Sequence, residues 1–177
     1  VPACCPGLAR GGAAARACAG SAVGVVEPGP PSSDPVTAGP GVQGATPAAL
    51  AAGFRLSHAF DAVASITSRT RVPVVLMTYW NPVLQYGVDR FADDLKAAGG
   101  AGLITPDLIP DDAEAWMNAS ERTGADRIFL AAPSSAAERR AMIPERSRGF
   151  VYAASTMRLT GARPAADRAA GPPVSPL

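Results

Sequence analysis

Short apolar runs alternate with amphipathic stretches through the middle of this chain. Five of the runs are mostly apolar and bounded by polar or turn-forming residues, which is typical of strands buried on both faces. They lie at residues 23–27, 72–79, 101–105, 127–132 and 149–154. Strands of this kind occur in parallel sheets that are covered by helices, so the pattern predicts an α/β fold.

Helical spacing of apolar residues fills most of the gaps between these strands. The predicted helices cover residues 57–68, 88–98, 111–123 and 134–147. Phe60, Val63 and Ile66 share one side of the first of them, as an amphipathic helix requires. A further helix runs from about residue 46 to 52, with Pro47 in its first turn, where proline is tolerated. Loops are predicted at residues 28–44, 81–87 and 107–110.

Two architectures fit a repeated strand–helix pattern, namely a closed (β/α)₈ barrel and an open doubly wound sheet. The first strand is not followed by the glycine-rich fingerprint of a dinucleotide-binding domain. Five strand-like runs are readable, whereas a closed barrel has eight in about 250 residues. Hydrophobic periodicity alone therefore leaves both architectures open.

The two ends of the chain lack this regular order. Residues 1–22 are rich in alanine, glycine, proline and cysteine, and a helix at residues 4–19 would have no clear amphipathic face. Residues 162–177 have no periodicity and are predicted to form a loose tail. The 177 residues thus predict one domain at residues 23–161, between a poorly matching N-terminal segment and that tail.

Composition and charge exclude several classes of function. A chain that is 47% hydrophobic and 18% charged is not disordered as a whole. The formal net charge of +1 gives no strong field that would attract nucleic acid or an anionic membrane. No apolar run is long enough to span a bilayer, and the first residues lack the pattern of a signal peptide. We therefore expect a cytoplasmic protein with no nucleic-acid or membrane partner.

Histidine and cysteine are too sparse to predict a metal site. The three cysteines are Cys4, Cys5 and Cys18, and His58 is the only histidine. Their spacings match no common ligand pattern, so we predict no metal and interpret the cysteines as structural or incidental. His58 is predicted to be a partly exposed residue near the start of its helix.

Four stretches carry a resemblance to a known family. They are VVEPGPPSSDPVTAGPGVQGAT at 25–46, VVLMTYWNPVLQYG at 74–87, AAGGAGLITPDLIP at 97–110 and RGFVYAASTMRLTG at 148–161. In order and spacing they resemble the α subunit of tryptophan synthase, over about residues 23–163. The resemblance implies the (β/α)₈ TIM-barrel fold, incomplete here with about five β/α units readable. Such barrels place their chemistry at the carboxyl ends of the strands, where all four stretches lie.

The resemblance also implies an activity and the residues that carry it. The family cleaves indole-3-glycerol phosphate to indole and glyceraldehyde 3-phosphate, a retro-aldol lyase step of tryptophan biosynthesis that uses no cofactor in the α subunit. Glu27 matches the catalytic acid/base, and Tyr152, Thr160 and Gly161 match substrate-binding positions. From the residues alone, Glu27 could instead end a strand at solvent, and Tyr152 could be a core aromatic side chain.

Several positions depart from the family pattern near this site. Ala38 replaces a second catalytic carboxylate, and losing one positioned acid/base typically costs about 10² to 10⁴ in rate. Pro28 removes a ladder donor beside Glu27, and Arg158 stands where the family has a glycine. No phosphate-binding loop of the family is matched beyond residue 163. We therefore expect an altered, truncated copy with impaired activity, or alternatively a non-catalytic binding remnant or a fragment without function.

The resemblance implies one protein partner. In the family, the α subunit binds a β subunit in an α₂β₂ heterotetramer, and the β subunit uses pyridoxal phosphate to join indole with serine. The matching interface positions are Pro30, Pro31, Asp34, Asn81 and Asp107. Each of these residue types is also common in ordinary loops.

Overall fold

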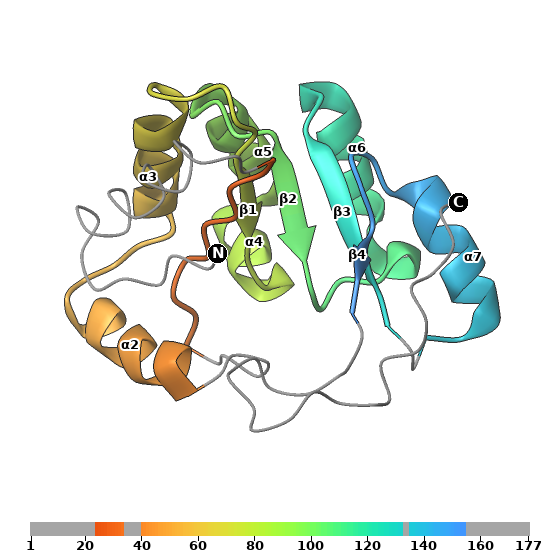
Figure 1. Ribbon diagram of the computed structural model, residues 1–177, viewed down its shortest axis with the longest axis horizontal. Helices are drawn as coiled ribbons and strands as arrows, with labels where there is room; N and C mark the ends of the chain where they lie inside the picture. Colours follow the sequence, from red (N-terminus) through yellow and green to blue (C-terminus); the bar gives the residue numbers. More distant parts are fainter. Residues whose placement is uncertain (1–23, 34–39, 133–134, 155–177) are drawn as a thin grey trace.

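Four parallel strands form a sheet whose spatial order follows the order of the chain (Figure 1). The computed structural model describes residues 24–33, 40–132 and 135–154. The strands are β1 (Val75–Met77), β2 (Gly102–Thr105), β3 (Asp126–Ala131) and β4 (Tyr152–Ala153). Val75 pairs with Gly102, and Leu130 pairs with Tyr152, which fixes the register at the two outer pairs.

Helices connect each strand to the next, as parallel pairing requires. The helical elements are α2 (Pro40–Ala51), α3 (Ser57–Thr67), α4 (Trp80–Tyr86), α5 (Val88–Ala97), the 3₁₀ turn η1 (Pro110–Asp112), α6 (Glu114–Thr123) and α7 (Ala137–Arg146). Within the described part of the chain, no helix is long and apolar enough to cross a membrane.

The two faces of the sheet are packed differently. One face carries Leu76, Leu103 and Phe129, which are fully buried in the large core formed with the helices. The other face, called the inner face here, carries a small cluster of Val75, Ile104 and Ile128 that is lined by other residues of the strands and their immediate flanks. Helices on one face and strands in chain order are the arrangement of a barrel wall, whereas a doubly wound sheet has helices on both faces. The predicted barrel-type α/β fold is therefore confirmed for this part of the chain.

Aromatic side chains fill the core between the sheet and the helices. Phe60 on α3 lies 5.3 Å from Phe91 on α5, measured between ring centroids, and Phe91 lies 6.2 Å from Trp116 on α6. Such edge-on ring pairs add to the stabilisation that burial alone supplies. Phe60, Val63 and Ile66 are all buried, so the predicted amphipathic face of α3 is confirmed.

The first predicted strand pairs with β1 but remains an isolated bridge. Val26 is bridged to Val74 in parallel, and its carbonyl oxygen accepts a hydrogen bond from the N–H of Val75 at 2.9 Å. The parallel hydrogen bonding continues for two more residues, because the N–H of Met77 donates to the carbonyl oxygen of Pro28 at 3.0 Å. Pro28 has no N–H to give in return, as expected, and the ladder stops short of a regular strand.

A helix occupies the predicted loop at residues 81–87, so that prediction was wrong. Helix α4 begins at Trp80 and includes Asn81 and Pro82 in its first turn. Proline is tolerated there, because the first N–H groups of a helix have no intrahelical partner. The N–H of Trp80 instead donates to both carboxylate oxygens of Asp107, at 2.9 and 3.0 Å. A cap that comes from 27 residues away leaves no local signal in the sequence.

Other boundaries differ from the prediction for local reasons. Helix α2 begins at Pro40 rather than near residue 46, and Pro47 lies inside it rather than in its first turn. Pro40 is itself suited to the first helical position, so the helix starts at the earlier of the two prolines. The segments 1–22 and 162–177, including all three cysteines, lie outside the described residues.

Candidate functional site

Glu27 lies at the end of the segment that pairs with β1, on the inner face of the sheet. Its neighbour Val26 is only 5% exposed and belongs to the helix-facing core. Side chains alternate along an extended chain, so Glu27 points to the opposite side, toward the inner face that carries Val75. The hydrogen bonds that β1 makes on either side of Glu27 hold its backbone in place.

The carboxyl group of Glu27 is perturbed by its surroundings. The residue is half-buried, and burial raises its pKa above the ordinary value for a glutamate. Burial has this effect because a poorly solvated carboxylate is less stable than the neutral acid. A carboxyl group with a raised pKa keeps its proton to a higher pH than an ordinary glutamate, which is a property that suits a general acid.

Tyr152 lies on the same inner face, at the opposite edge of the sheet. Its side chain packs against the cluster of Val75, Ile104 and Ile128 and is half-buried. Burial raises the pKa of Tyr152, and the negative charge of Glu27 raises it further. The structure therefore brings together the two described residues that sequence analysis assigned to the active site, in one electrostatic environment.

Asn81 and Asp107 also come together, near the carboxyl ends of β1 and β2. Both are exposed, and Asn81 directly follows Trp80, whose N–H is held by Asp107. Asp107 therefore has a structural role within the chain, in addition to any contact with a partner. Pro30 and Pro31 are half-buried and follow Pro28, which is bonded to the end of β1.

The remaining predicted site residues cannot be placed. Asp34, Ala38, Arg158, Thr160 and Gly161 lie outside the described residues. Within the described ranges, no group of three or more histidine, cysteine, aspartate or glutamate side chains could hold a metal ion. His58 is partly exposed as predicted, and its Nδ1 accepts a hydrogen bond from the N–H of Arg55 at 3.1 Å.

Met77 is a neighbour of the site that the sequence motifs did not reveal. Met77 is half-buried at the end of β1 and packs against the inner-face cluster, on the same face as Glu27 and Tyr152. The alternation of side chains along β1 could have identified it, because Leu76 is fully buried on the other face. An apolar side chain at this position offers a surface for an apolar part of a ligand.

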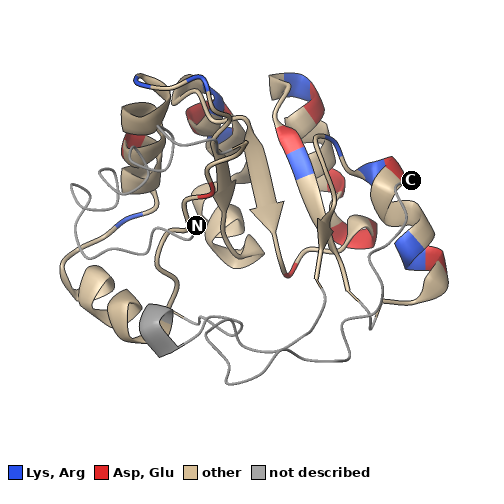
Figure 2. Cartoon of the chain, in the orientation of Figure 1, with Lys and Arg blue, Asp and Glu red and all other residues tan. Residues whose placement is uncertain are grey.

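Other charged residues lie on helices, in loops and at the start of β3 (Figure 2). Strands β1, β2 and β4 contain no charged residue. Glu27 is thus an ionisable group on the face of the sheet that carries the apolar cluster of Val75, Ile104 and Ile128. Perturbed ionisable groups of this kind mark candidate functional sites.

Comparison with known proteins identifies a family. The family model for the tryptophan synthase alpha chain matches residues 1–175, a wider range than the residues that carry the sequence motifs. The tryptophan synthase alpha chain of Leifsonia xyli subsp. xyli is 60% identical over 170 residues, covering 96% of this chain and 65% of the relative. That of Mycobacterium marinum is 61% identical over 146 residues, covering 82% and 54% respectively.

Solved structures give the same result. A structure of Mycobacterium tuberculosis tryptophan synthase superposes with a TM-score of 0.86 at 54% identity, covering 92% of this chain and 63% of that one. A tryptophan synthase complex from Pyrococcus furiosus superposes with a TM-score of 0.69 at 37% identity, covering 74% and 55%. The chain thus spans between about half and two thirds of the length of these proteins.

Proposed function

Because this chain belongs to the tryptophan synthase alpha chain family, we propose that it is a lyase that cleaves indole-3-glycerol phosphate to indole and glyceraldehyde 3-phosphate. The observation that carries the proposal is Glu27, a half-buried carboxyl group with a raised pKa on the inner face of a barrel wall. We place the reaction in tryptophan biosynthesis in the cytoplasm. It needs no cofactor of its own in this chain.

Glu27 would carry the proton transfers of the cleavage. The neutral carboxyl group gives a proton to the ring carbon that bears the side chain, and the resulting carboxylate takes the proton of the adjacent side-chain hydroxyl. The bond between that ring carbon and the side chain then breaks, and the products are indole and an aldehyde. The proton that the carboxyl group gave stays on the ring carbon of indole, and the hydroxyl proton replaces it on Glu27, so one glutamate balances the whole step.

Tyr152 would bind the substrate beside Glu27. Its ring borders the apolar cluster of the inner face and offers a hydroxyl group to the polar side chain of the substrate. Thr160 and Gly161, which follow β4 in the sequence, would also contact the substrate. The chain has Ala38 where the family has a carboxylate that stabilises charge at the indole nitrogen. We therefore propose that the reaction runs more slowly than in other members of the family.

We propose that the partner is a tryptophan synthase β subunit, in an α₂β₂ heterotetramer. That subunit would supply pyridoxal phosphate and consume the indole. The contact surface would include the cluster of Asn81 and Asp107, both exposed beyond the strand ends. Pro30, Pro31 and Asp34 would extend this surface along the first loop.

A second function is favoured by one specific observation, the replacement of the family's catalytic aspartate by Ala38. A chain that cannot stabilise charge on the indole could still dock on a β subunit through its exposed loops. Such a chain would be a binding module that alters the activity of the β subunit without releasing indole itself.

Indole release by the purified chain, with and without a β subunit, tests the lyase proposal. The variants are Glu27→Gln, which removes the proton donor, and Ala38→Asp, which restores the second carboxylate. We expect release from the parent, loss in Glu27→Gln and a gain of up to about 10² to 10⁴ in Ala38→Asp. Release that is equal in the parent and Glu27→Gln would refute the assignment of Glu27. Absence of release with retained co-elution of the two subunits would favour the binding module.

A further inference from the structure

Arg148 connects the segment before β4 to the start of β3 and the end of α6. Its Nη2 donates to the carbonyl oxygen of Ser120 at 2.7 Å and to that of Ala125, and its Nη1 donates to Oε2 of Glu121 at 3.5 Å. Its Nε lies 3.6 Å from Oδ1 of Asp126, an ion-pair distance that is too long for a hydrogen bond. A guanidinium can make these contacts together because its donors form a rigid planar fork.

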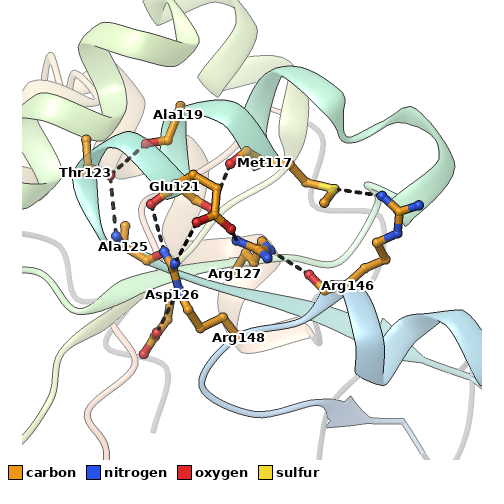
Figure 3. A network of polar contacts seen from close by, with 10 residues as sticks. Met117, Ala119, Glu121, Thr123, Ala125, Asp126, Arg127, Arg146 and Arg148 are labelled. Carbon is orange, nitrogen blue, oxygen red and sulfur yellow. Dashed lines mark hydrogen bonds and ion pairs between the residues drawn. The ribbon is translucent and has the colours of Figure 1, made fainter.

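Arg127 completes the polar network, which Figure 3 shows from close by. Its Nη1 donates to Oε1 of Glu121 at 2.7 Å, and its Nε donates to the carbonyl oxygen of Arg146 at 2.6 Å. Arg127 and Arg148 thus share one carboxylate, and the hydrogen bond from Arg127 lowers the pKa of Glu121. The network holds the end of α7 and Arg148, four residues before β4, against the start of β3.

The chain changes direction between Arg148 and Tyr152. The N–H of Arg148 donates to the carbonyl oxygen of Arg127 at 2.9 Å in an antiparallel bridge, whereas Tyr152 pairs with Leu130 in parallel. Gly149 makes this change with a φ of +94°, which residues with a side chain rarely adopt. A Cβ at Gly149 would also lie 2.9 Å from a carboxylate oxygen of the first residue of β3.

This turn determines how β4 is aligned with β3. Residue 148 is bridged to residue 127, and residue 152 is paired with residue 130. Between these two contacts the chain advances by four residues before β4 but by three along β3, so the segment before β4 contains one additional residue. With this alignment, Val151 packs in the helix-facing core and Tyr152 packs on the inner face. A shift of one residue would exchange these two side chains between the faces.

The strand itself is too short to select this alignment. Two residue pairs and one further hydrogen bond, from the N–H of Ala154 to the carbonyl oxygen of Ala131 at 2.8 Å, join β4 to β3. Backbone hydrogen bonds of this kind form equally well in neighbouring registers, so a short ladder specifies the register weakly. The side-chain contacts of Arg148 add to the packing of Val151 and Tyr152 in favouring the observed alignment.

We propose that Arg148 is a positioning residue that fixes the register of β4 and thereby presents Tyr152 on the inner face that carries Glu27. Its role in substrate binding rests on the proposed function, since it acts through Tyr152. The register itself does not rest on that function and can be tested without substrate.

The test follows the ionisation of Tyr152 by NMR in the full chain labelled with ¹³C at tyrosine Cζ. The Tyr152 signal is assigned by its loss in Tyr152→Phe. We expect Glu27→Gln to lower the titration midpoint of Tyr152 in the parent, because it removes a nearby negative charge. In Arg148→Met, the midpoint of Tyr152 falls, and Glu27→Gln lowers it no further.

A matched control separates register from a general loss of stability. Arg139→Met removes an exposed arginine that pairs with Asp111 at 3.2 Å on another part of the surface, and it should leave the coupling between Glu27 and Tyr152 unchanged. If Arg148→Met does not fold, Arg148→Lys takes its place. A single ammonium cannot reach both carbonyl groups and Glu121, so a lower Tyr152 midpoint and faster amide exchange at Ala154 are expected.

Unchanged coupling in Arg148→Met, or in Arg148→Lys if that variant is used, would overturn the proposal. So would a Tyr152 midpoint in the parent that does not respond to Glu27→Gln. In the indole-release assay, the Arg148 variant and Tyr152→Phe are both expected to raise KM more than they lower kcat. If no variant releases indole, the proposed function fails while the titration still decides the register.

Discussion

At the amino ends of β3 and β4, acidic side chains lie beside arginines, whereas at the other end of the sheet Glu27 lies near Tyr152. The difference appears in the acidity of the groups. The hydrogen bond from Arg127 lowers the pKa of Glu121, while burial raises the pKa of Glu27. A carboxylate that is well stabilised supports the fold, and one that is poorly stabilised is available for proton transfer. We therefore propose that one end of this sheet serves stability and that the other serves chemistry.

The largest expected effect comes from the end that we assign to chemistry. Glu27→Gln should lower the rate of indole release by about 10² to 10⁴, because the proton donor is lost. The same change should leave the unfolding temperature equal or slightly higher, since an amide costs less to bury than a carboxylate. Steady-state rates and calorimetry on the same preparation measure both effects. A variant that loses activity only because it unfolds would contradict the division between the two ends.

The next effect comes from the other end. Arg127→Met should lower the free energy of unfolding by about 2 to 3 kcal/mol, because the change leaves the carbonyl group of Arg146 and Glu121 without this donor. Denaturant unfolding measures it, with Arg139→Met as a control that should cost at most about 1 kcal/mol. The titration of Glu27 should remain as in the parent. Equal losses in the two variants would show that the network near β3 is no more than a surface ion pair.

A smaller effect is expected for Asp107, which caps α4. Asp107→Ala should cost about 1 kcal/mol of stability, the usual value for loss of a helix cap, because the N–H of Trp80 loses its acceptor. Asp107→Asn keeps one acceptor oxygen and should cost less. Urea unfolding of both variants makes the comparison. If binding to a β subunit falls equally in both while stability differs, Asp107 contacts the partner directly.

The smallest effect is a contrast in the dependence of stability on pH. The lowered pKa of Glu121 gives stability that is present above the ordinary pKa of a glutamate and is lost as the pH falls through the lowered value. The raised pKa of Glu27 acts with the opposite sign, since its contribution is fully present at acidic pH and is lost as the pH rises through the raised value.

Unfolding curves from acidic to neutral pH, measured on the parent, Glu121→Gln and Glu27→Gln, separate these two contributions. Relative to the parent, Glu121→Gln should be less stable near neutral pH and converge with it in acid. Glu27→Gln should be at least as stable as the parent near neutral pH and lose that advantage in acid. Parallel curves for all three proteins would remove the contrast between the two glutamates.

The sequence predicted the elements that have strong local signals. Helices α3 and α5 match their predicted ranges within one residue, because their apolar residues repeat with helical spacing and Gly99 ends the second one with a positive φ. The parallel order of the sheet followed from apolar strands separated by helices. Helix α4 was missed because Asp107, which holds its first turn, comes from the loop after the next strand.

The site was predicted only in part, for a related reason. Resemblance to the family identified Glu27 and Tyr152, but apolar periodicity does not show that they share one face of the sheet. That fact depends on the bridge at Val26 and on the register of β4. Arg148 could not have been found from its sequence context, because its partners lie more than 20 residues away along the chain.

The order of the strands has a consequence for how the molecule is made. Each strand pairs with the one that precedes it in the chain, so a strand needs only residues that have already left the ribosome. Domains fold as their segments emerge during synthesis, N-terminal part first. In such a process β4 is added after β3, which is already paired with β2. The contacts of Arg127 and Arg148 near the start of β3 would then form as the segment before β4 joins the sheet.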